Sequence, residues 1–179
     1  IWKHHPEKVL GVNPSFAAQR RGDLKLLMRA ILEASSYIDD GQHKAAVAKE
    51  IAKQSYVNAA PDVIDARLEG KYTLGKDLGE HVYAEDTMRF SNGGFVNLPR
   101  RAHAAWFMAE YVRHGYLKEL PDVQAISQRL ILGDLYREVA QEVSLAVPDD
   151  DMAPFALTLD GARFDPARPA VYLRDKGPG

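Results

Sequence analysis

The sequence has 179 residues, of which 46% are hydrophobic and 27% are charged, a composition typical of a globular protein with a buried core. It excludes disordered and collagen-like chains. The 23 Lys and Arg residues and 25 Asp and Glu residues give a formal net charge of -2, so we expect no nucleic-acid partner. The absence of Cys excludes disulfides, thiolate nucleophiles and Cys-ligated zinc. No apolar run approaches the roughly 20 residues of a membrane span.

The first 16 residues are expected to be irregular. Pro6, Gly11 and Pro14 interrupt any regular pattern there, which favours a loop or a short extended stretch. The first residue is Ile1 rather than Met. From this we expect either an upstream segment that has been removed or a piece of a longer protein.

Residues 17–70 are expected to be helical. Apolar residues recur at i, i+3, i+4 and i+7 spacing at Leu24, Leu27, Met28, Ile31 and Ile38. Gly41 is the expected end of this helix, and a weaker helical pattern follows over 43–54. Pro61 fits the first position of a further short helix, and Gly70 fits the position after its end.

Helical periodicity returns strongly over 99–147. Around Trp106 the apolar residues form two stripes, which predicts a helix buried between two layers of structure. Gly115 is expected to end this helix in a left-handed conformation. Two further helices are expected at 121–130 and 134–146. A helix with two apolar faces needs a partner layer, which indicates that another part of the protein exists.

The remaining regions are expected to contain little regular structure. Residues 71–98 combine four Gly with strand-favouring residues and predict short strands in an irregular segment. The tail has one expected strand at 155–159. We therefore divide the chain into a main part, residues 1–147, and a C-terminal tail, residues 148–179. The main part comprises a cleft segment (1–16), a helical region (17–70), an irregular segment (71–98) and helices (99–147).

Known chemical motifs are missing from the sequence. It contains no P-loop, dinucleotide fingerprint, nucleophile elbow or HExxH motif, so we expect no cofactor and no catalytic residues. The side chains of His4 and His5 diverge, while His103 and His114 are three helical turns apart, so neither pair predicts a metal site. The acidic run 149–151 is expected to be a solvated loop.

Two segments carry more specific patterns. In His5-Pro6-Glu7-Lys8, a proline-fixed turn presents a carboxylate and an ammonium group just before the helical region. The alternative is an ordinary surface loop. Arg100 and Arg101 occupy the first turn of an expected helix, where the helix dipole disfavours cations. This placement predicts pairing with acidic groups or an interface role, and the alternative is an exposed helix start.

These segments resemble the nitrate/bicarbonate branch of the solute-binding proteins of ABC transporters. The most specific match is Pro99-Arg100-Arg101-Ala102-His103 followed by Trp106-Phe107. The others, in the same order as in the family, are Ile1 to Lys8, Arg29 to Ser35, Arg67 to Tyr72, Met88 to Phe90, Tyr111 to Leu117, Asp134 to Glu138, Leu159 to Gly161 and Phe164 to Pro166. The resemblance covers nearly the whole chain.

The resemblance implies an α/β, periplasmic-binding-protein-like (type II) fold with two lobes and roughly twice this length. The present, mainly helical chain is expected to be its C-terminal part. In the family the anion binds between the lobes, and most of its ligands belong to upstream segments. The family's cleft lysine matches Lys8, which is therefore the expected ligand-binding residue. His5 and Glu7 are expected only as neighbours of the site.

The implied function is binding of nitrate or nitrite as the substrate-binding component of an ABC transporter, without catalysis. Nitrate is planar and weakly basic, and a lysine ammonium supplies the point charge that such an anion needs. The expected partners are ABC permease subunits at the inner membrane, and the expected location is the periplasm or the outer face of that membrane. The alternatives are a bicarbonate-binding relative, a cytoplasmic nitrate sensor of the same fold, a regulatory domain fused to a transporter ATPase, and a helical enzyme domain.

Overall fold

The computed structural model describes residues 1–3, 5 and 8–179. Most of its regular structure is helical, with short 3₁₀ turns written as η. In chain order the elements are α1 (Pro14–Gln19), α2 (Arg21–Asp39), η1 (Gly41–His43), α3 (Lys44–Ile51), α4 (Pro61–Leu68), β1 (Lys71–Thr73), β2 (Glu80–Val82), η2 (Ala84–Asp86), α5 (Arg101–Arg113), α6 (Val123–Leu130), α7 (Gly133–Glu142), β3 (Phe155–Ala156), β4 (Arg163–Phe164) and α8 (Pro169–Lys176).

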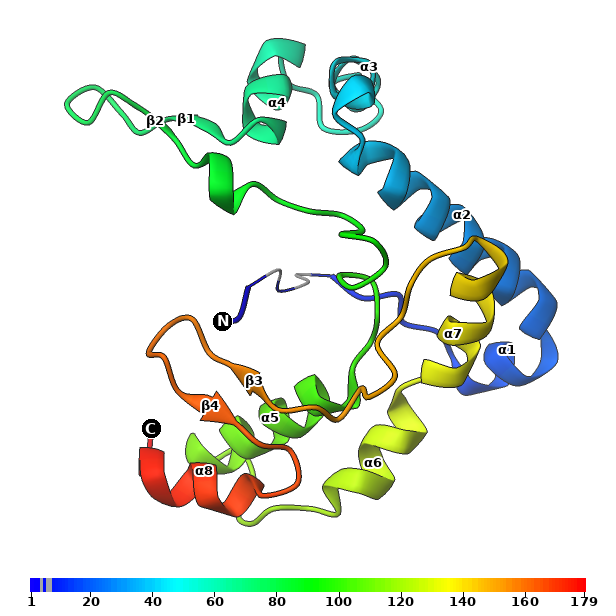
Figure 1. The fold of residues 1–179 in the computed structure, drawn as a ribbon, viewed down its shortest axis with the longest axis vertical. Helices are drawn as coiled ribbons and strands as arrows, with labels where there is room; N and C mark the ends of the chain where they lie inside the picture. The colour runs from blue at the N-terminus through cyan, green and yellow to red at the C-terminus, as the bar shows by residue number, and fades with distance from the viewer. Residues whose placement is uncertain (4, 6–7) are drawn as a thin grey trace.

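The elements form an open, curved arrangement around a central space (Figure 1). One end, called here the upper region, contains α3, α4 and the β1–β2 hairpin. The other end, the lower region, contains α5, α6, α8 and the β3–β4 hairpin. The long helix α2 and its neighbour α7 connect the two regions along one side, and the described residues before α1 lie in the space between the regions.

The strands form two separate antiparallel hairpins rather than one sheet. In the upper hairpin Lys71 pairs with Val82 and Thr73 with Glu80. In the lower hairpin Phe155 pairs with Phe164, which makes β3 shorter than the predicted strand. The irregular middle segment with short strands is confirmed.

The predicted helix boundaries are largely confirmed because they depend on local signals. The first strong helix, α2, ends at Asp39, two residues before Gly41. Pro61 occupies the first turn of α4, and Gly70 follows that helix with a φ of 76°. A Cβ added to Gly70 would lie 2.7 Å from the carbonyl oxygen of Tyr83, so only glycine fits there.

Two helices were not expected. Helix α1 begins at Pro14, inside the segment predicted to be irregular, because Asn13 caps it: the Asn13 Oδ1 atom accepts a hydrogen bond from the Ser15 N–H at 2.9 Å. Helix α8 lies in the tail and begins at Pro169. Its Tyr172 side chain is buried against α5, so this segment of the tail packs on the helices that precede it. The proposed division at residue 147 stays a prediction.

Three hydrophobic clusters hold the fold together. The lower cluster contains Trp2, Ala105, Trp106, Met108, Ala109, Val123, Leu157, Phe164 and Tyr172. The middle cluster joins α2 to α7 through Leu32, Leu98, Tyr136, Val139 and Ala140. The upper cluster contains only small or medium-sized side chains, Ala48, Ala52 and Ile64.

Ion pairs on the surface add a second connection between α2 and α7. The Lys25 ammonium lies 2.8 Å from a carboxylate oxygen of Glu138 and 2.6 Å from one of Glu142. The Arg21 guanidinium lies 2.7 Å from the other Glu138 oxygen. These hydrogen-bonded carboxylates raise the pKa of Lys25 above its ordinary value. The two helices are therefore joined both through the middle cluster and through this group of charges.

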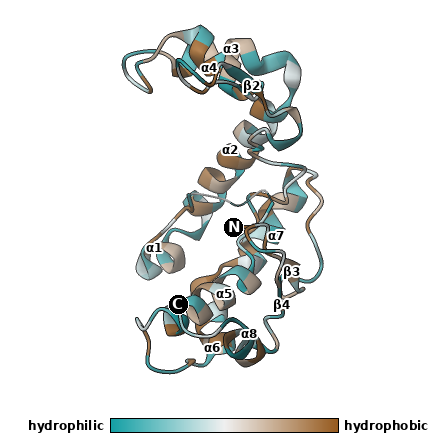
Figure 2. Cartoon of the chain, turned by 90° about the vertical axis from the view of Figure 1, so that its left-hand side faces the viewer, coloured by the Kyte–Doolittle hydropathy of each residue, from teal (hydrophilic) through white to brown (hydrophobic). Residues whose placement is uncertain are grey.

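The two apolar stripes of α5 are buried to different extents. Ala102, Ala105 and Ala109 are completely buried, whereas on the other stripe Met108 is buried but Phe107 and Tyr111 are 39% and 49% exposed. The expected second layer over this face stays a prediction. Hydrophobic stretches also occur along α2 (Figure 2), where Leu26 and Leu27 are exposed.

No helix in the described part of the chain combines the length and the apolar character needed to cross a membrane.

Candidate functional site

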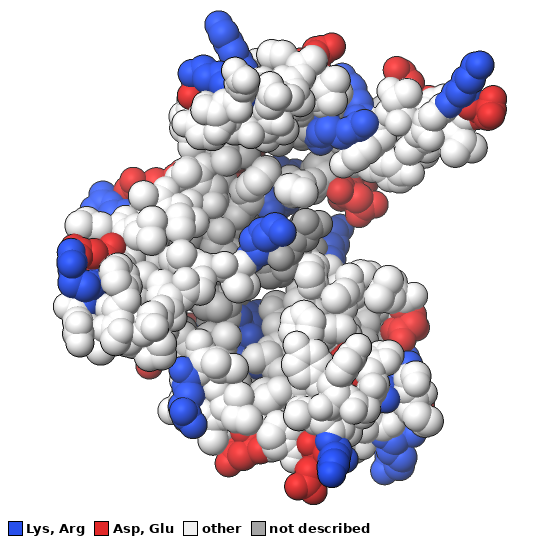
Figure 3. Space-filling view, turned by 180° about the vertical axis from the view of Figure 1, so that it is seen from behind, with Lys and Arg blue, Asp and Glu red and all other residues white. Residues whose placement is uncertain are grey.

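The surface is hollowed between the upper and lower regions, and Figure 3 shows Lys and Arg side chains at this hollow. Lys8, the residue predicted to bind the ligand, belongs to the N-terminal stretch that precedes α1.

Lys8 is exposed, and within the described residues its ammonium group forms no hydrogen bond or ion pair. By contrast, the next basic residues along the chain form ion pairs: Arg20, Arg21 and Lys25 are each paired with a carboxylate. A lysine that forms no ion pair within the protein has its three N–H donors available for an external anion. The other residues of the predicted turn, His4, Pro6 and Glu7, lie outside the described residues.

Trp2 attaches the start of this segment to the lower region. Its ring is 8% exposed and stacks on the His103 ring of α5, with ring centroids 4.1 Å apart and an angle of 26° between the planes. It also contacts Trp106 of α5 and Phe155 of β3 edge to face, at 5.6 Å and 5.2 Å. His5, an expected neighbour of the site, packs against Trp2, with the two ring centroids 4.5 Å apart.

The His103 imidazole is neutral in this setting. Burial lowers its pKa from 6.5 to about 3, and the positive charge of Arg100 and the proximity of His5 act in the same direction. A neutral ring stacks on Trp2 without bringing a charge into the lower cluster. The sequence pattern Pro99-Arg100-Arg101-Ala102-His103 thus has a structural role, which is to build the surface on which Trp2 rests.

The two arginines at the start of α5 have separate partners. Arg101 forms a bidentate interaction with Asp151, with 2.8 Å from Nη2 to Oδ1 and 2.9 Å from Nε to Oδ2. The prediction that these arginines pair with acidic groups is confirmed for Arg101. The Arg100 Nη2 atom donates to the carbonyl oxygen of Ala153 at 2.6 Å, and its buried Nε atom has no partner among the described residues.

Asp151 corrects the expectation that the acidic run 149–151 is a solvated loop. Its side chain is only 2% exposed, and Arg137 approaches it at 3.8 Å in addition to Arg101. Burial raises the pKa of Asp151, but the hydrogen bonds from Arg101 outweigh burial and hold this pKa below its ordinary value. The Asp151 carbonyl oxygen also accepts a hydrogen bond from the Ala102 N–H, so this residue fixes the beginning of α5.

Asp39 is a second carboxylate whose role the sequence did not reveal. Its Oδ1 atom accepts from the Phe90 N–H at 2.8 Å, and its Oδ2 atom accepts from the N–H groups of Ser91 and Asn92 at 2.9 Å and 2.7 Å. Asp39 therefore joins the end of α2 to the irregular middle segment. Asp39 is in the last turn of α2, where the helix dipole disfavours a carboxylate, but this local feature does not identify a partner about 50 residues away.

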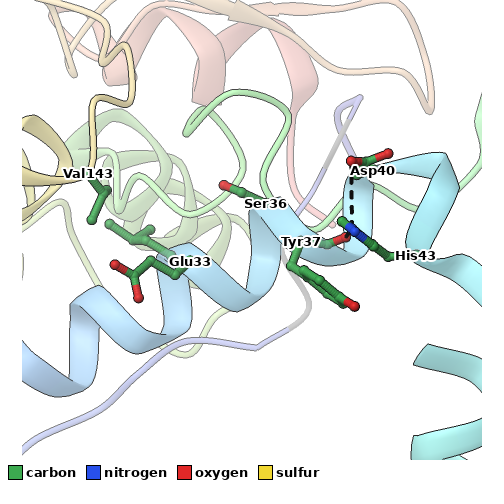
Figure 4. Close-up of a pocket in the computed structure, with 7 residues that line it drawn as sticks. Glu33, Ser36, Tyr37, Asp40, His43 and Val143 are labelled. Carbon is green, nitrogen blue, oxygen red and sulfur yellow. Dashed lines mark hydrogen bonds and ion pairs between the residues drawn. The ribbon is translucent and has the colours of Figure 1, made fainter. Parts of the chain in front are cut away.

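A surface pocket of about 380 Å³ lies beside the end of α2 and does not suit an anion. Glu33, Ser36 and Tyr37 line it from α2, and Asp40 and His43 line it from the helix end (Figure 4). The His43 ring stacks on Tyr37 and lies 3.6 Å from the Asp40 carboxylate. Two carboxylates and no Lys or Arg line this pocket, so it would repel nitrate.

A second pocket, of about 480 Å³, lies between α8 and the β3–β4 hairpin. Of the three basic residues that line it, Arg163, Arg168 and Lys176, the last two form ion pairs: Arg168 pairs with Asp165 at 2.8 Å and Lys176 pairs with Asp160. Within the described residues, no group of three His, Asp or Glu side chains is arranged to hold a metal ion. Lys8 stays the predicted ligand-binding residue.

Comparison with known proteins identifies relatives of the whole chain. Residues 1–53 match the NMT1-like family. The nitrate/nitrite binding protein NrtA of Synechocystis sp. PCC 6803 is 29% identical over 178 residues, and the bicarbonate-binding protein CmpA of Synechococcus elongatus PCC 7942 is 24% identical over 189 residues. The crystal structure of the periplasmic nitrate-binding protein NrtA from Synechocystis PCC 6803 matches with a TM-score of 0.86 at 27% identity, covering 97% of this chain.

The resemblance to nitrate/bicarbonate-type solute-binding proteins is confirmed. This chain matches them over 97% of its length but spans only 39% of NrtA, 41% of CmpA and 46% of the NrtA crystal structure. Its mainly helical structure is thus part of a periplasmic-binding-protein-like (type II) α/β fold. The relatives named here are binding proteins, which favours binding over catalysis.

Proposed function

We propose that this chain is part of the substrate-binding component of an ABC transporter that takes up nitrate or nitrite. The observation that carries the proposal is the likeness to NrtA, in sequence and in fold, over 97% of the chain. The hollow with basic side chains between the two regions supports it, because an interlobe anion site needs local positive charge rather than a basic surface.

Lys8 is the residue proposed to contact the anion. Its ammonium group has no carboxylate partner among the described residues, so binding an anion would not require an existing ion pair to be broken. A singly charged anion gains most from one fixed cation together with neutral donors. The neutral donors are expected from the remainder of a two-lobed fold.

Nitrate and bicarbonate are the two substrates to be distinguished. The likeness to CmpA, at 24% identity, keeps a bicarbonate-binding relative as the alternative. Bicarbonate can be held through a bridging metal ion, for which an acidic ligand would be more useful than a lysine. The chemistry of Lys8 therefore favours nitrate.

The proposed location is the periplasm, and the proposed partners are the permease subunits of the same transporter. Ligand binding would favour the closed arrangement of the two lobes, and the closed form would dock on the permease. A cytoplasmic sensor with the same fold would use the same closure to signal to a regulatory partner instead.

Calorimetric titration of the full-length protein with nitrate, nitrite and bicarbonate tests the proposed function. Loss of one charged hydrogen bond costs about 1.5–3 kcal/mol, so Lys8→Ala is expected to weaken nitrate binding by roughly 10- to 100-fold. Lys118→Ala is the matched control, since Lys118 is exposed and distant in sequence from the cleft segment. Heat from bicarbonate alone would contradict the nitrate proposal, and unchanged affinity in Lys8→Ala would contradict the assigned residue.

A further inference from the structure

The upper region, residues 41–86, is packed as a separate unit. The upper cluster and the side chains packed against it all belong to this range. In the described part of the chain, the hydrogen bonds between this range and the other residues involve only Tyr37 and Asp40, at the end of α2. The chain enters the region after Asp40 and leaves it at Thr87 (Figure 1). The orientation of the upper region is therefore set mainly at these two crossings.

Asp39 joins the two crossings to each other. It lies in the last turn of α2, next to the entry. Its carboxylate accepts hydrogen bonds from three consecutive backbone N–H groups just after the exit, those of Phe90, Ser91 and Asn92, at distances between 2.7 and 2.9 Å. Hydrogen bonds to an ionised acceptor are roughly twice as strong as those between neutral groups. Three of them on one carboxylate therefore hold the exit segment against the end of the helix.

The segment that Asp39 binds is also attached to the middle of the molecule. Ser91 is 1% exposed, and its hydroxyl oxygen lies 3.2 Å from that of Ser36 in α2. The Gly94 carbonyl oxygen accepts a hydrogen bond from the Tyr136 hydroxyl of α7 at 2.7 Å. The backbone of residues 87–89, which links the upper region to this fixed segment, forms no hydrogen bonds within the described residues. A change in the angle of the upper region is therefore expected at this link, directly beside the Asp39 carboxylate.

We propose that Asp39 is a positioning residue that sets the orientation of the upper region, and with it the width of the hollow between the upper and lower regions. The part of this inference that concerns anion binding rests on the proposed function. Asp39 does not contact the anion, because N–H groups occupy both of its carboxylate oxygens. It acts by keeping the entry and exit crossings side by side, so that they form one joint.

Distance measurements between two spin labels on the full-length protein test this role without a ligand. This chain contains no Cys, so Lys49→Cys on α3 and Gln128→Cys on α6 place one exposed label in each region. Asp39→Ala removes the acceptor oxygens and should broaden the distance distribution measured by double electron–electron resonance. Asp39→Asn keeps one carbonyl oxygen as an acceptor and should give an intermediate width. It also decides the question if Asp39→Ala does not fold. An unchanged distribution in the folded variants would overturn the proposal.

Two control variants separate the joint from effects of charge and of stability. Asp62→Ala removes an exposed carboxylate of the upper region that forms no hydrogen bond or ion pair within the described residues. Ile64→Ala weakens the upper cluster without touching Asp39. Both should leave the distance distribution unchanged. If Ile64→Ala broadened the distribution as much as Asp39→Ala, loss of stability would explain the result, and the proposal would fail.

Nitrate titration of the same variants connects the joint to the anion site. If the upper region has the binding orientation for only a fraction of the time, the apparent affinity falls in proportion to that fraction. Asp39→Ala should therefore weaken nitrate binding on the order of threefold to tenfold, whereas Asp62→Ala should not change it. Unchanged affinity in Asp39→Ala, in a protein that binds nitrate, would overturn the proposal. If the protein binds no nitrate while the label distances respond as expected, the proposed function fails and the positioning by Asp39 stands.

Discussion

The upper and lower regions each combine helices with a two-stranded hairpin, but their cores are very different. The lower cluster contains two Trp, a Phe and a Tyr, whereas the upper cluster is built around Ala48, Ala52 and Ile64. Since each aromatic side chain buries about 150–250 Å², the lower region gains far more from packing. The difference predicts that the lower region, whose cluster includes Trp2, contributes more to the free energy of unfolding than the upper region.

The largest loss of stability is expected for Phe164→Ala in the lower region. Phe164 is completely buried and contacts both Phe155 and Tyr172. Removing such a ring leaves a cavity and costs about 3–5 kcal/mol in the free energy of unfolding. Urea denaturation followed by circular dichroism measures this loss. A loss below about 1 kcal/mol would show that the lower region is not the main source of stability.

A smaller effect is expected for Ile64→Ala in the upper region. Ile64 is 8% exposed, and its buried partners are alanines that lose few contacts when it is shortened. The cost should be near the lower end of the range for such substitutions, about 2 kcal/mol. The same denaturation experiment measures it. A cost equal to that of Phe164→Ala would contradict the contrast between the two regions.

The smallest expected effect is the loss of stability at low pH that comes from His103 in the lower region. Burial, with Arg100 and His5, lowers the pKa of His103 to about 3, whereas an unfolded histidine has a pKa of 6.5. Above pH 6.5 the His103 imidazole is neutral in both the folded and the unfolded state, so its protonation costs no stability there. As the pH falls from 6.5 towards 3, only the unfolded chain takes up the proton, and stability is progressively lost.

At pH 5.5 this loss amounts to about 1.4 kcal/mol relative to pH 7.5. Unfolding experiments at the two pH values, on the protein and on His103→Phe, isolate the contribution of this ring. The phenylalanine variant keeps the stacking on Trp2 but does not titrate, so its stability should fall less on acidification. An identical fall in both proteins would show that His103 is not neutral in the folded state.

The parts of the fold that the sequence predicted are those determined by neighbouring residues. The period of α2, the proline at the start of α4 and the glycines after α4 and α5 act within one or two turns of chain. Helix α8 also carried a local signal, Pro169 at its first position, but the Pro- and Asp-rich composition around it favoured a loop.

The parts that were not predicted depend on contacts between distant residues. Asp151 is buried because Arg101 and Arg137 come from two other helices, and nothing within the run 149–151 indicates this. The contact between Trp2 and His103 likewise joins residues about a hundred positions apart. For the candidate site, the family resemblance alone selected Lys8, since an isolated lysine in a loop is ordinarily a solvated surface residue.

The length of helix α2 has a consequence for the proposed closure of the two lobes. Its first half is joined to α7 by Arg21 and Lys25, while its last turn leads into the upper region. A helix of 19 residues is about 28 Å long, so a tilt of about 10° at its base moves its far end by about 5 Å. In the proposed closure, a small tilt of α2 relative to α7 would therefore displace the upper region by several ångström.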